Sequence, residues 1–423
     1  MTAEPGAYAV GEPITDGVRT VNFFNGRLLT GDDLSREQAA GKALRDRLGL
    51  AVGEGVVSGL RVSVPPGADR TVPRVAVTEG VAVNRLGAAL RLPRDTLVTL
   101  ARPAGPASAP PTRRDDFSAC SGLADSAPLT VAGVYLLTVA PSAAPVGRAP
   151  VSGLGDETAA CATDLSAEGV EFRVIRLDLD PALLADTAYL RNRLAHLMFG
   201  TNDARRGRLE RDPFGTPAGR YGLLDDLRAT RLRPAEVPLA CLLWTPGTGI
   251  GFVDMWSVRR RTTRSCADPD WPEVTGERRT AEGEAIFLQF QEQVGDLRSA
   301  TAPETIAATD HFVFLPAAGL LPLASGGRRG HDLRVFFQGM PCRGPAVIEA
   351  AHVADLLRRS FGHPPMSPAD GEAVWLYLVR PNLLPSTPQP QEYAIFTSGH
   401  LPYRGDARFD LAYWNYANYA RVG

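Results

Sequence analysis

The sequence has almost no lysine. Lys42 is the single lysine among the 45 basic residues, and arginine supplies all the others. Alanine is abundant, as are glycine and proline with 42 and 35 residues, so the arginine reflects the amino-acid bias of a GC-rich genome rather than phosphate recognition. The formal net charge is only -2, which supplies no field for steering onto nucleic acid. The composition therefore predicts no nucleic-acid partner.

Cysteine pairs and long apolar runs are also missing. No CxxC pair occurs, which argues against a zinc knuckle or a thioredoxin-like site, and an odd, scattered set is typical of a reducing compartment. The five cysteines are Cys120, Cys161, Cys241, Cys266 and Cys342. No apolar stretch approaches the roughly 20 residues that span a bilayer, and no signal peptide is recognisable. We expect a cytoplasmic protein that does not insert directly into membranes.

Sequence motifs that define a catalytic or metal centre are absent as well. The segment Gly247–Phe252, GTGIGF, precedes a strand-like run, so it indicates a tight turn rather than a dinucleotide loop. The six histidines form no HxH or HExxH pattern, and no GxSxG elbow occurs. Adjacent carboxylates such as Asp225 and Asp226 point in different directions along a helix or strand, so they do not make an acid/base pair. The sequence predicts no enzyme, no cofactor and no metal site.

What is present is a long chain built from several small units. At 423 residues, with 44% hydrophobic and 22% charged residues, it is a globular protein of about two or three domains. Alternating strand patterns and a few amphipathic patterns predict a multi-domain α+β fold with small, mostly antiparallel β units and Pro-rich linkers. We divide the chain into an N-terminal helix and small β domain (1–100), a Pro/Ala-rich linker (101–127), a middle α+β domain (128–265), and a C-terminal α+β domain with an aromatic tail (266–423).

The opening stretch from Val21, VNFFNGRLLTGDDLSREQ, contains a turn and a helix start. Asn25–Gly26 is a turn signal because both residues tolerate positive φ. Thr30 stands at an N-cap position with Asp33 three residues later, a variant of the capping box. We expect the two preceding phenylalanines, Phe23 and Phe24, to lie in the core. The predicted helix ends near Gly49 and has small or apolar residues at helical spacing, namely Leu34, Gly41, Leu44 and Leu48.

Further elements follow from the same patterns. The run from Val237 to Arg261 predicts a hairpin, two apolar strands around a Pro/Gly turn. In the last third we expect a helix over 284–298, strands at HFVFLP and LRVFFQG, a helix at AVIEAAHVADLLRRSF, and strands at VWLYLVR and EYAIFTS.

Two segments are candidate partner contacts. The basic run VRRRTTR, Val258 to Arg264, indicates a solvated strand end or a contact with an acidic neighbouring subunit; its arginines are Arg259, Arg260, Arg261 and Arg264. Five aromatic side chains so close together in the C-terminal tail are not expected to be fully exposed to solvent. We expect them to dock on their own domain, on a partner subunit or on a sugar. These residues are Phe409, Tyr413, Trp414, Tyr416 and Tyr419.

The first hundred residues resemble a recurring N-terminal pattern of proteins encoded in phage-tail-like, contractile injection system gene clusters. The matching residues are Phe24, Gly26, Leu28, Leu29, Thr30, Asp33, Glu37 and Gln38 in the first part, Gly55, Val56, Val57, Gly59 and Leu60 in the second, and Gly80, Ala82 and Gly87 in the third. The family also shows an aromatic residue and a histidine before its G-V-V strand, where this chain has GLAVGEG. The contact made by that histidine is therefore missing here.

This resemblance implies a structural, non-enzymatic subunit of a contractile particle, at the baseplate or another terminal position. Its partners would be baseplate, sheath or tube proteins, assembled in the cytoplasm and released on lysis. Two alternatives stay open at the level of sequence. One is a receptor- or glycan-binding module of the tail-fibre type, which uses the aromatic tail. The other is a cargo hydrolase whose active site gathers distant residues, among them His196, His311, His363 and His400.

Overall fold

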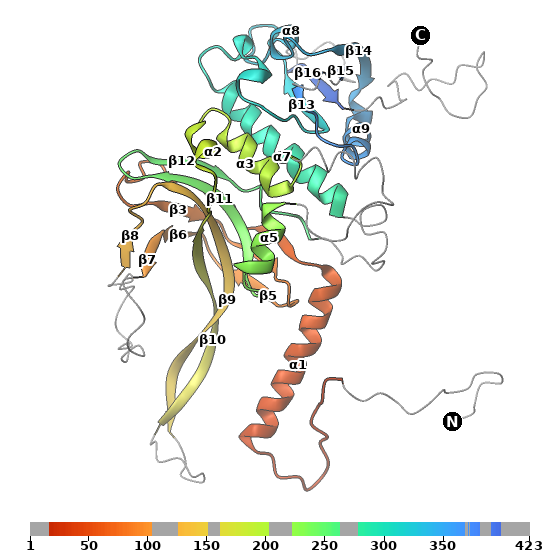
Figure 1. The fold of residues 1–423 in the computed structure, drawn as a ribbon. Helices are drawn as coiled ribbons and strands as arrows, with labels where there is room; N and C mark the ends of the chain where they lie inside the picture. The colour runs from red at the N-terminus through yellow and green to blue at the C-terminus, as the bar shows by residue number, and fades with distance from the viewer. Residues whose placement is uncertain are drawn as a thin grey trace, which may run out of the picture.

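The computed structural model describes residues 17–103, 126–150, 161–202, 222–262, 278–368, 371, 373–380 and 391–398. Figure 1 shows small sheets flanked by helices, with two long elements that project from the body. The fold is mixed α+β and its sheets are mainly antiparallel, as predicted. No helix within these ranges is long and apolar enough to cross a membrane.

Two three-stranded antiparallel sheets follow helix α1 (Gly31–Val52). Their strand orders are β1-β4-β5 and β2-β3-β6. The strands are β1 (Gly55–Gly59), β2 (Val62–Ser63), β3 (Arg74–Val77), β4 (Gly80–Val83), β5 (Ala89–Leu92) and β6 (Thr96–Thr99). Short pieces of the predicted linker are also strands, because β7 (Ala101–Pro103) pairs with β8 (Ser126–Pro128).

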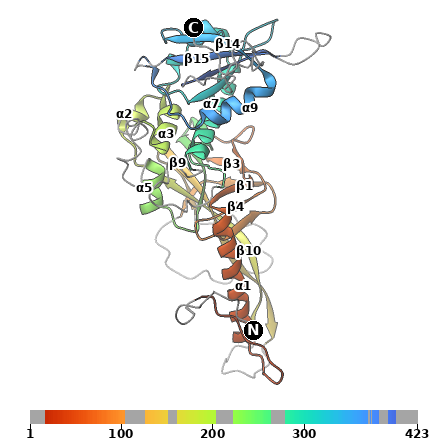
Figure 2. The same cartoon turned by 90° about the vertical axis from the view of Figure 1, so that its right-hand side faces the viewer.

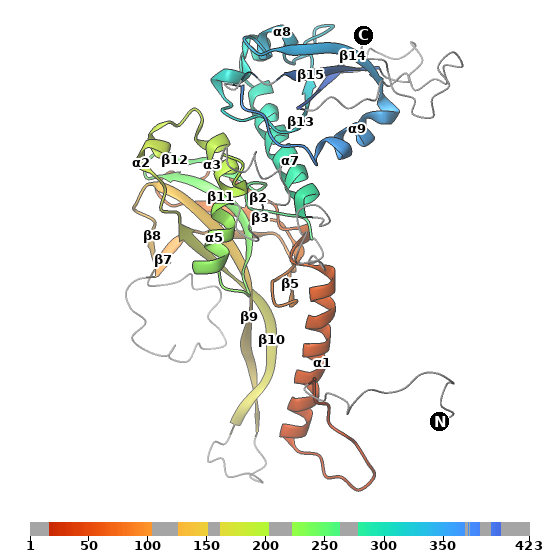
Figure 3. The same ribbon diagram turned by 45° about the vertical axis from the view of Figure 1, so that its right-hand side comes forward.

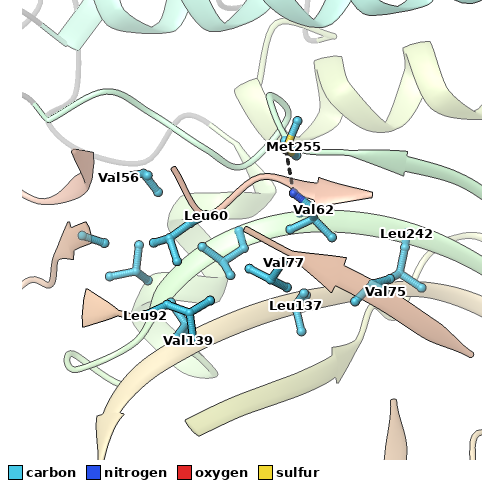
Figure 4. Close-up of a cluster of buried hydrophobic side chains, with 14 of the residues drawn as sticks. Val56, Leu60, Val62, Val75, Val77, Leu92, Leu137, Val139, Leu242 and Met255 are labelled. Atoms are coloured by element: carbon cyan, nitrogen blue, oxygen red, sulfur yellow. Dashed lines mark hydrogen bonds between the residues drawn. The ribbon is translucent and has the colours of Figure 1, made fainter. Parts of the chain in front are cut away.

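The central sheet has the order β10-β9-β11-β12 and is antiparallel throughout. Its strands are β9 (Gly133–Pro150), β10 (Cys161–Arg176), β11 (Val237–Thr245) and β12 (Gly249–Asp254). The β11–β12 pair is the predicted hairpin. One face of this sheet packs on the N-terminal sheets, so that Leu60 and Val77 share a core with Leu137 and Leu242 (Figure 4). The stretches predicted as separate domains 1–100 and 128–265 therefore share one hydrophobic core.

The other face of the central sheet is covered by short helices. These are α2 (Pro181–Ala185), α3 (Leu190–Phe199) and α5 (Leu223–Thr230). Along β9, Tyr135, Leu137 and Val139 face the N-terminal sheets, whereas Val134 and Leu136 pack with the helices. Burial on both faces explains why VYLLTVA is apolar except for Thr138, since a strand covered on both sides needs no polar alternation.

The C-terminal unit is a four-stranded sheet of order β13-β16-β15-β14, with β14 parallel to β15. Its strands are β13 (Ala318–Pro322), β14 (Cys342–Glu349), β15 (Val374–Arg380) and β16 (Tyr393–Thr397). Long helix α7 (Arg278–Arg298) contributes Phe290 to a cluster with Phe312 and Phe396, and α9 (Val353–Ser360) contributes Leu356 to a second cluster with Ile348. Helices therefore support this sheet.

Two of the predicted strands in this unit are wrong. LRVFFQG begins with helix α8 (Leu333–Phe336), because the Asp332 side chain accepts hydrogen bonds from the backbone N–H groups of Arg334 and Val335 and so caps a helix. HFVFLP is irregular, with a single bridge at Leu315. The predicted helix AVIEAAHVADLLRRSF is in part the strand β14, and α9 begins only at Val353.

Two elements extend away from the body in the same direction. Helix α1, red-orange in Figure 1, stands apart from the sheets over most of its length, as Figure 3 also shows. The β9–β10 hairpin runs beyond the central sheet, because β11 pairs with β9 only as far as Val139. From Ala140 to Pro150, β9 pairs with β10 alone. We call this outer part the β9–β10 ribbon (140–150 and 161–171); Figure 2 shows that it and α1 extend to the same end of the molecule.

Candidate functional site

The predicted basic run does not form a solvated strand end. Strand β12 stops at Asp254, a turn follows, and Val258 is buried. Arg259 donates from Nη2 to the Gly59 carbonyl over 2.7 Å, and its guanidinium lies 5.5 Å from the centroid of the Trp256 ring. Burial, together with the positive charge of Arg61, lowers the pKa of Arg259 to about 10. Arg259 thus joins the turn after β12 to the N-terminal sheets.

The next two arginines also contact the chain's own elements. The Arg260 guanidinium lies 4.5 Å from the centroid of the Phe199 ring at the end of α3, and it donates from Nη1 to the Trp256 carbonyl over 3.1 Å. Arg261 pairs through Nε with Glu284 of α7 at 2.9 Å. Its side chain is half exposed, so a contact with an acidic neighbour stays a prediction for Arg261; Arg264 lies outside the described residues.

A partly buried ion cluster lies close to this segment, and we did not predict it. Arg191 of α3 contacts three carboxylates: Asp254 at 3.3 Å, Glu292 at 3.1 Å and Asp296 at 2.7 Å. Asp254 is fully buried at the end of β12, whereas Glu292 and Asp296 belong to α7. No local pattern in the sequence connects these residues, because the cluster exists only once α3, β12 and α7 have packed together.

Two carboxylates of the cluster have further hydrogen-bond partners. Asp254 accepts hydrogen bonds from the Ser257 backbone N–H at 3.0 Å and from Gln289 Nε2 at 2.9 Å. Trp256 Nε1 donates to Glu292 over 2.8 Å. Burial, followed by the charge of Asp254, raises the pKa of Glu292. Burial alone would lower the pKa of Arg191, but its carboxylate neighbours outweigh that effect and the net direction is upward.

Apolar packing and an amide side chain complete the contact between the middle of the chain and the C-terminal unit. Ala195 and Phe199 of α3 pack against Ala285 and Ile286 of α7. Asn192 of α3 is buried; it accepts from the backbone N–H groups at positions 313 and 314, and donates to the carbonyl at position 314. We call this contact the α3–α7 joint (residues 191–199, 254–261 and 284–296). These ion pairs, hydrogen bonds and apolar contacts are typical of a structural contact between two parts of a protein.

The other predicted site residues divide between buried positions and undescribed ones. His196 of α3 is buried, with Nδ1 2.7 Å from the Thr201 hydroxyl and its ring 5.0 Å from Phe314. His311 and His363 lie on turns of the C-terminal unit, and His400 is outside the described residues. The five aromatics of the C-terminal tail are outside them too. Among the described residues no group of His, Cys, Asp and Glu is placed to hold a metal ion.

Exposed apolar side chains concentrate in and before α1. The described part of the chain has sixteen exposed large hydrophobic residues, and nine of them lie between residues 23 and 52. They are Phe23, Phe24, Leu28, Leu29, Leu34, Leu44, Leu48, Leu50 and Val52. The prediction that Phe23 and Phe24 are core residues is therefore wrong, since they are 51% and 63% exposed. Nothing in the local sequence distinguishes a buried from an exposed apolar residue beside a turn.

The ribbon carries exposed apolar residues as well. Val146 on β9 is 46% exposed, and Leu165, its register partner on β10, is 61% exposed. Both long edges of the ribbon lack a strand partner among the described residues. The candidate interaction surfaces are therefore the segment before α1, α1 itself and the ribbon.

Comparisons with known proteins give little further guidance. No protein-family model matches the chain, and no curated protein matches it. Among solved structures, the crystal structure of TssK aligns over 91% of this chain and 92% of that one, with 11% sequence identity and a TM-score of 0.22. A TM-score of that size carries no inference about fold or function.

Proposed function

We propose that this protein is a non-enzymatic structural subunit of a phage-tail-like contractile injection particle, at the baseplate or another terminal position. It acts through contacts with baseplate, sheath or tube proteins. The proposal rests on the N-terminal pattern and on what the structure does with the residues of that pattern.

The single observation that carries the proposal is that some residues of the N-terminal pattern stabilise the chain's own helix, whereas others are exposed apolar side chains. Thr30 and Asp33 form the capping box, so they serve the chain's own fold. Phe24, Leu28 and Leu29 belong to the same pattern but are 63%, 89% and 54% exposed. Apolar side chains gathered beside a well-capped helix are typical of a surface that another subunit covers.

The other parts of the molecule fit the same role. The α3–α7 joint connects the C-terminal unit to α3 and to the end of β12, which suits a subunit that spans several neighbours. A two-stranded ribbon is at best marginally stable alone in water, so contacts along its open edges and its Val146–Leu165 pair would stabilise it. Ribbons of this kind add strands to a neighbour or lie against its surface.

Co-purification tests the proposal directly. The tagged chain is expressed in cells that carry its gene cluster, captured from a gentle lysate, and analysed by mass spectrometry and negative-stain microscopy. We expect sheath, tube and baseplate proteins in the eluate, and particles in the images. Capture of the chain as a small species free of such proteins would show the proposal to be wrong.

A matched pair of variants makes the experiment specific. Leu28→Ser combined with Leu29→Ser should reduce the co-purifying particle proteins, because it removes two exposed apolar side chains from the pattern. The control is Leu97→Ser on β6, which is 64% exposed and lies away from the pattern, and which should leave the eluate unchanged. Equal loss in both variants would argue against the surface named here.

A further inference from the structure

The apolar residues of α1 form one stripe. At 100° per residue, Leu34, Gly41, Leu44, Leu48 and Val52 fall within about 80° of the helix circumference. Their side chains are exposed, with Leu34 at 51%, Leu44 at 47% and Leu48 at 69%. Leu50 is also exposed but lies on the opposite side of the helix, about 160° from Leu34. We call the five residues the α1 stripe.

Two leucines of the stripe are placed symmetrically about its glycine, whereas Leu44 and Val52 have no apolar counterpart. Gly41 lies at the middle of α1, seven residues after Leu34 and seven before Leu48. A Cβ added there would meet only the end of the flexible Arg45 side chain, at 3.6 Å, so space is open above the glycine. Glycine inside a helix costs about 1 kcal/mol relative to alanine, and close approach of another backbone is a physical reason to keep one.

The charges of α1 are distributed unevenly along the helix. The first half of the helix, 31–41, holds three acidic residues and one basic residue; the second half, 42–52, holds three basic residues and one acidic residue. The helix is thus neutral overall but acidic at one end and basic at the other. Two copies side by side in opposite directions would bring unlike halves together, and their macrodipoles would also oppose each other favourably.

We propose that α1 binds α1 of a second copy of this chain, antiparallel, with the two-fold axis at Gly41. Leu34 then faces Leu48 of the second copy, Glu37 faces Arg45 of the second copy, and symmetry repeats each contact. A two-fold interface uses the same surface on both subunits, and the symmetric spacing of Leu34, Gly41 and Leu48 fits that requirement. The inference does not depend on the injection-particle proposal, because it concerns the purified chain alone.

Lys42 gives the unmodified protein a direct test. It is the chain's single lysine and lies on α1 next to Gly41, so the proposed pairing brings the two Lys42 amines to the same side of the interface. An amine-reactive cross-linker should therefore join Lys42 of one copy to Lys42 of the other, as identified by peptide mass spectrometry. Sedimentation over about a hundredfold range of protein concentration should show a monomer–dimer equilibrium.

Two sets of variants test the stripe and its direction. Leu34→Gln with Leu48→Gln should weaken dimerisation at least about tenfold, because four apolar side chains, and with them both Leu34–Leu48 contacts of the dimer, are lost. Leu50→Gln should leave dimerisation unchanged. Glu37→Arg and Arg45→Glu should each weaken the dimer, and the double variant should restore it. Restored dimerisation in the double variant indicates an antiparallel pair. In a parallel pair, Glu37 would face Glu37 of the second copy and Arg45 would face Arg45.

Three outcomes would overturn the inference. One is a chain that stays monomeric at every concentration. Another is a dimer that forms without a Lys42–Lys42 cross-link or that ignores the stripe substitutions. The third is a monomeric chain whose stripe is needed only for capture of particle proteins, which would assign α1 to a foreign subunit and leave the particle proposal intact. Because Leu34, Leu48 and Leu50 are exposed, circular dichroism should show unchanged folding in the leucine variants.

Discussion

The Nε atom of Arg191 lies 3.3 Å from Oδ2 of Asp254, a carboxylate with no exposed surface. The arginine belongs to α3 and the aspartate ends β12, and the same guanidinium also reaches Glu292 and Asp296 on α7. One buried side chain thus connects three elements that meet at the α3–α7 joint.

Removing the buried carboxylate should be far more costly than removing an exposed one. Asp254→Ala leaves Arg191 partly uncompensated and deprives Ser257 and Gln289 of their acceptor, so it should lower the free energy of unfolding by about 3–5 kcal/mol. Asp296→Ala removes a carboxylate that is 73% exposed and contacts the same arginine, and should cost less than about 1 kcal/mol. Urea denaturation compares the two; equal effects would contradict the structure.

Asn192 should protect two backbone amides of the C-terminal unit from exchange. Its side-chain oxygen accepts from the N–H groups of Val313 and Phe314, at 2.9 and 3.0 Å. Asn192→Ala leaves both donors without that partner and should cost about 1–3 kcal/mol for each group that stays buried. Hydrogen–deuterium exchange at these two amides should speed up, while exchange in β9 should not change.

The stability of the C-terminal unit should fall as the solution becomes mildly acidic. His331 is buried, and burial lowers its pKa, an effect that the Pro303 carbonyl near Nδ1 offsets only in part. The unfolded chain therefore binds the proton more readily than the folded one. Stability is lost as pH falls through about 6.5, the ordinary histidine value, toward the lower folded pKa.

Thermal unfolding between mildly alkaline and mildly acidic pH checks this prediction. The wild-type melting temperature should drop in that window, and His331→Leu should flatten the profile even if it lowers stability at all pH values. An unchanged slope in His331→Leu would contradict the role of His331.

The first turn of α1 should depend on its cap. Thr30 accepts a hydrogen bond from the Asp33 N–H, and Asp33 in turn accepts one from the Thr30 N–H. Thr30→Ala should destabilise the helix by about 1 kcal/mol, visible as faster exchange of the first α1 amides. Ser35→Ala is the control, because the Ser35 hydroxyl only bonds back to the Gly31 carbonyl, a contact that does not support a helix.

Chemistry that is local in the sequence was predicted well. The turn at Asn25–Gly26 is present, with a hydrogen bond from the Arg27 N–H to the Phe24 carbonyl, and Thr30 is the N-cap. The α1 helix runs three residues past the predicted end and terminates at Gly53, in positive φ. These features need no information from the rest of the chain, because a turn residue or a cap acts within one or two turns of itself.

Features that depend on tertiary packing were missed. AVIEAA has good helix formers, yet Val347 and Ile348 pair with β15, so tertiary pairing overrides local propensity. Leu44 and Leu48 have helical spacing but are 47% and 69% exposed, since a periodic pattern does not say what covers the apolar side. The α3–α7 joint gathers residues more than a hundred positions apart, from Arg191 to Asp296, and no spacing rule brings them together.

The β9–β10 ribbon has a mechanical consequence. From Ala140 to Pro150, β9 would reach about 35 Å beyond the sheet at the usual rise per residue, which is comparable with the diameter of a small domain. Its base, Val139, sits in the core between β10 and β11 rather than at a sheet edge. A force applied to the outer end of the ribbon would therefore act on β9, an inner strand of the central sheet, and not on a strand at the sheet edge.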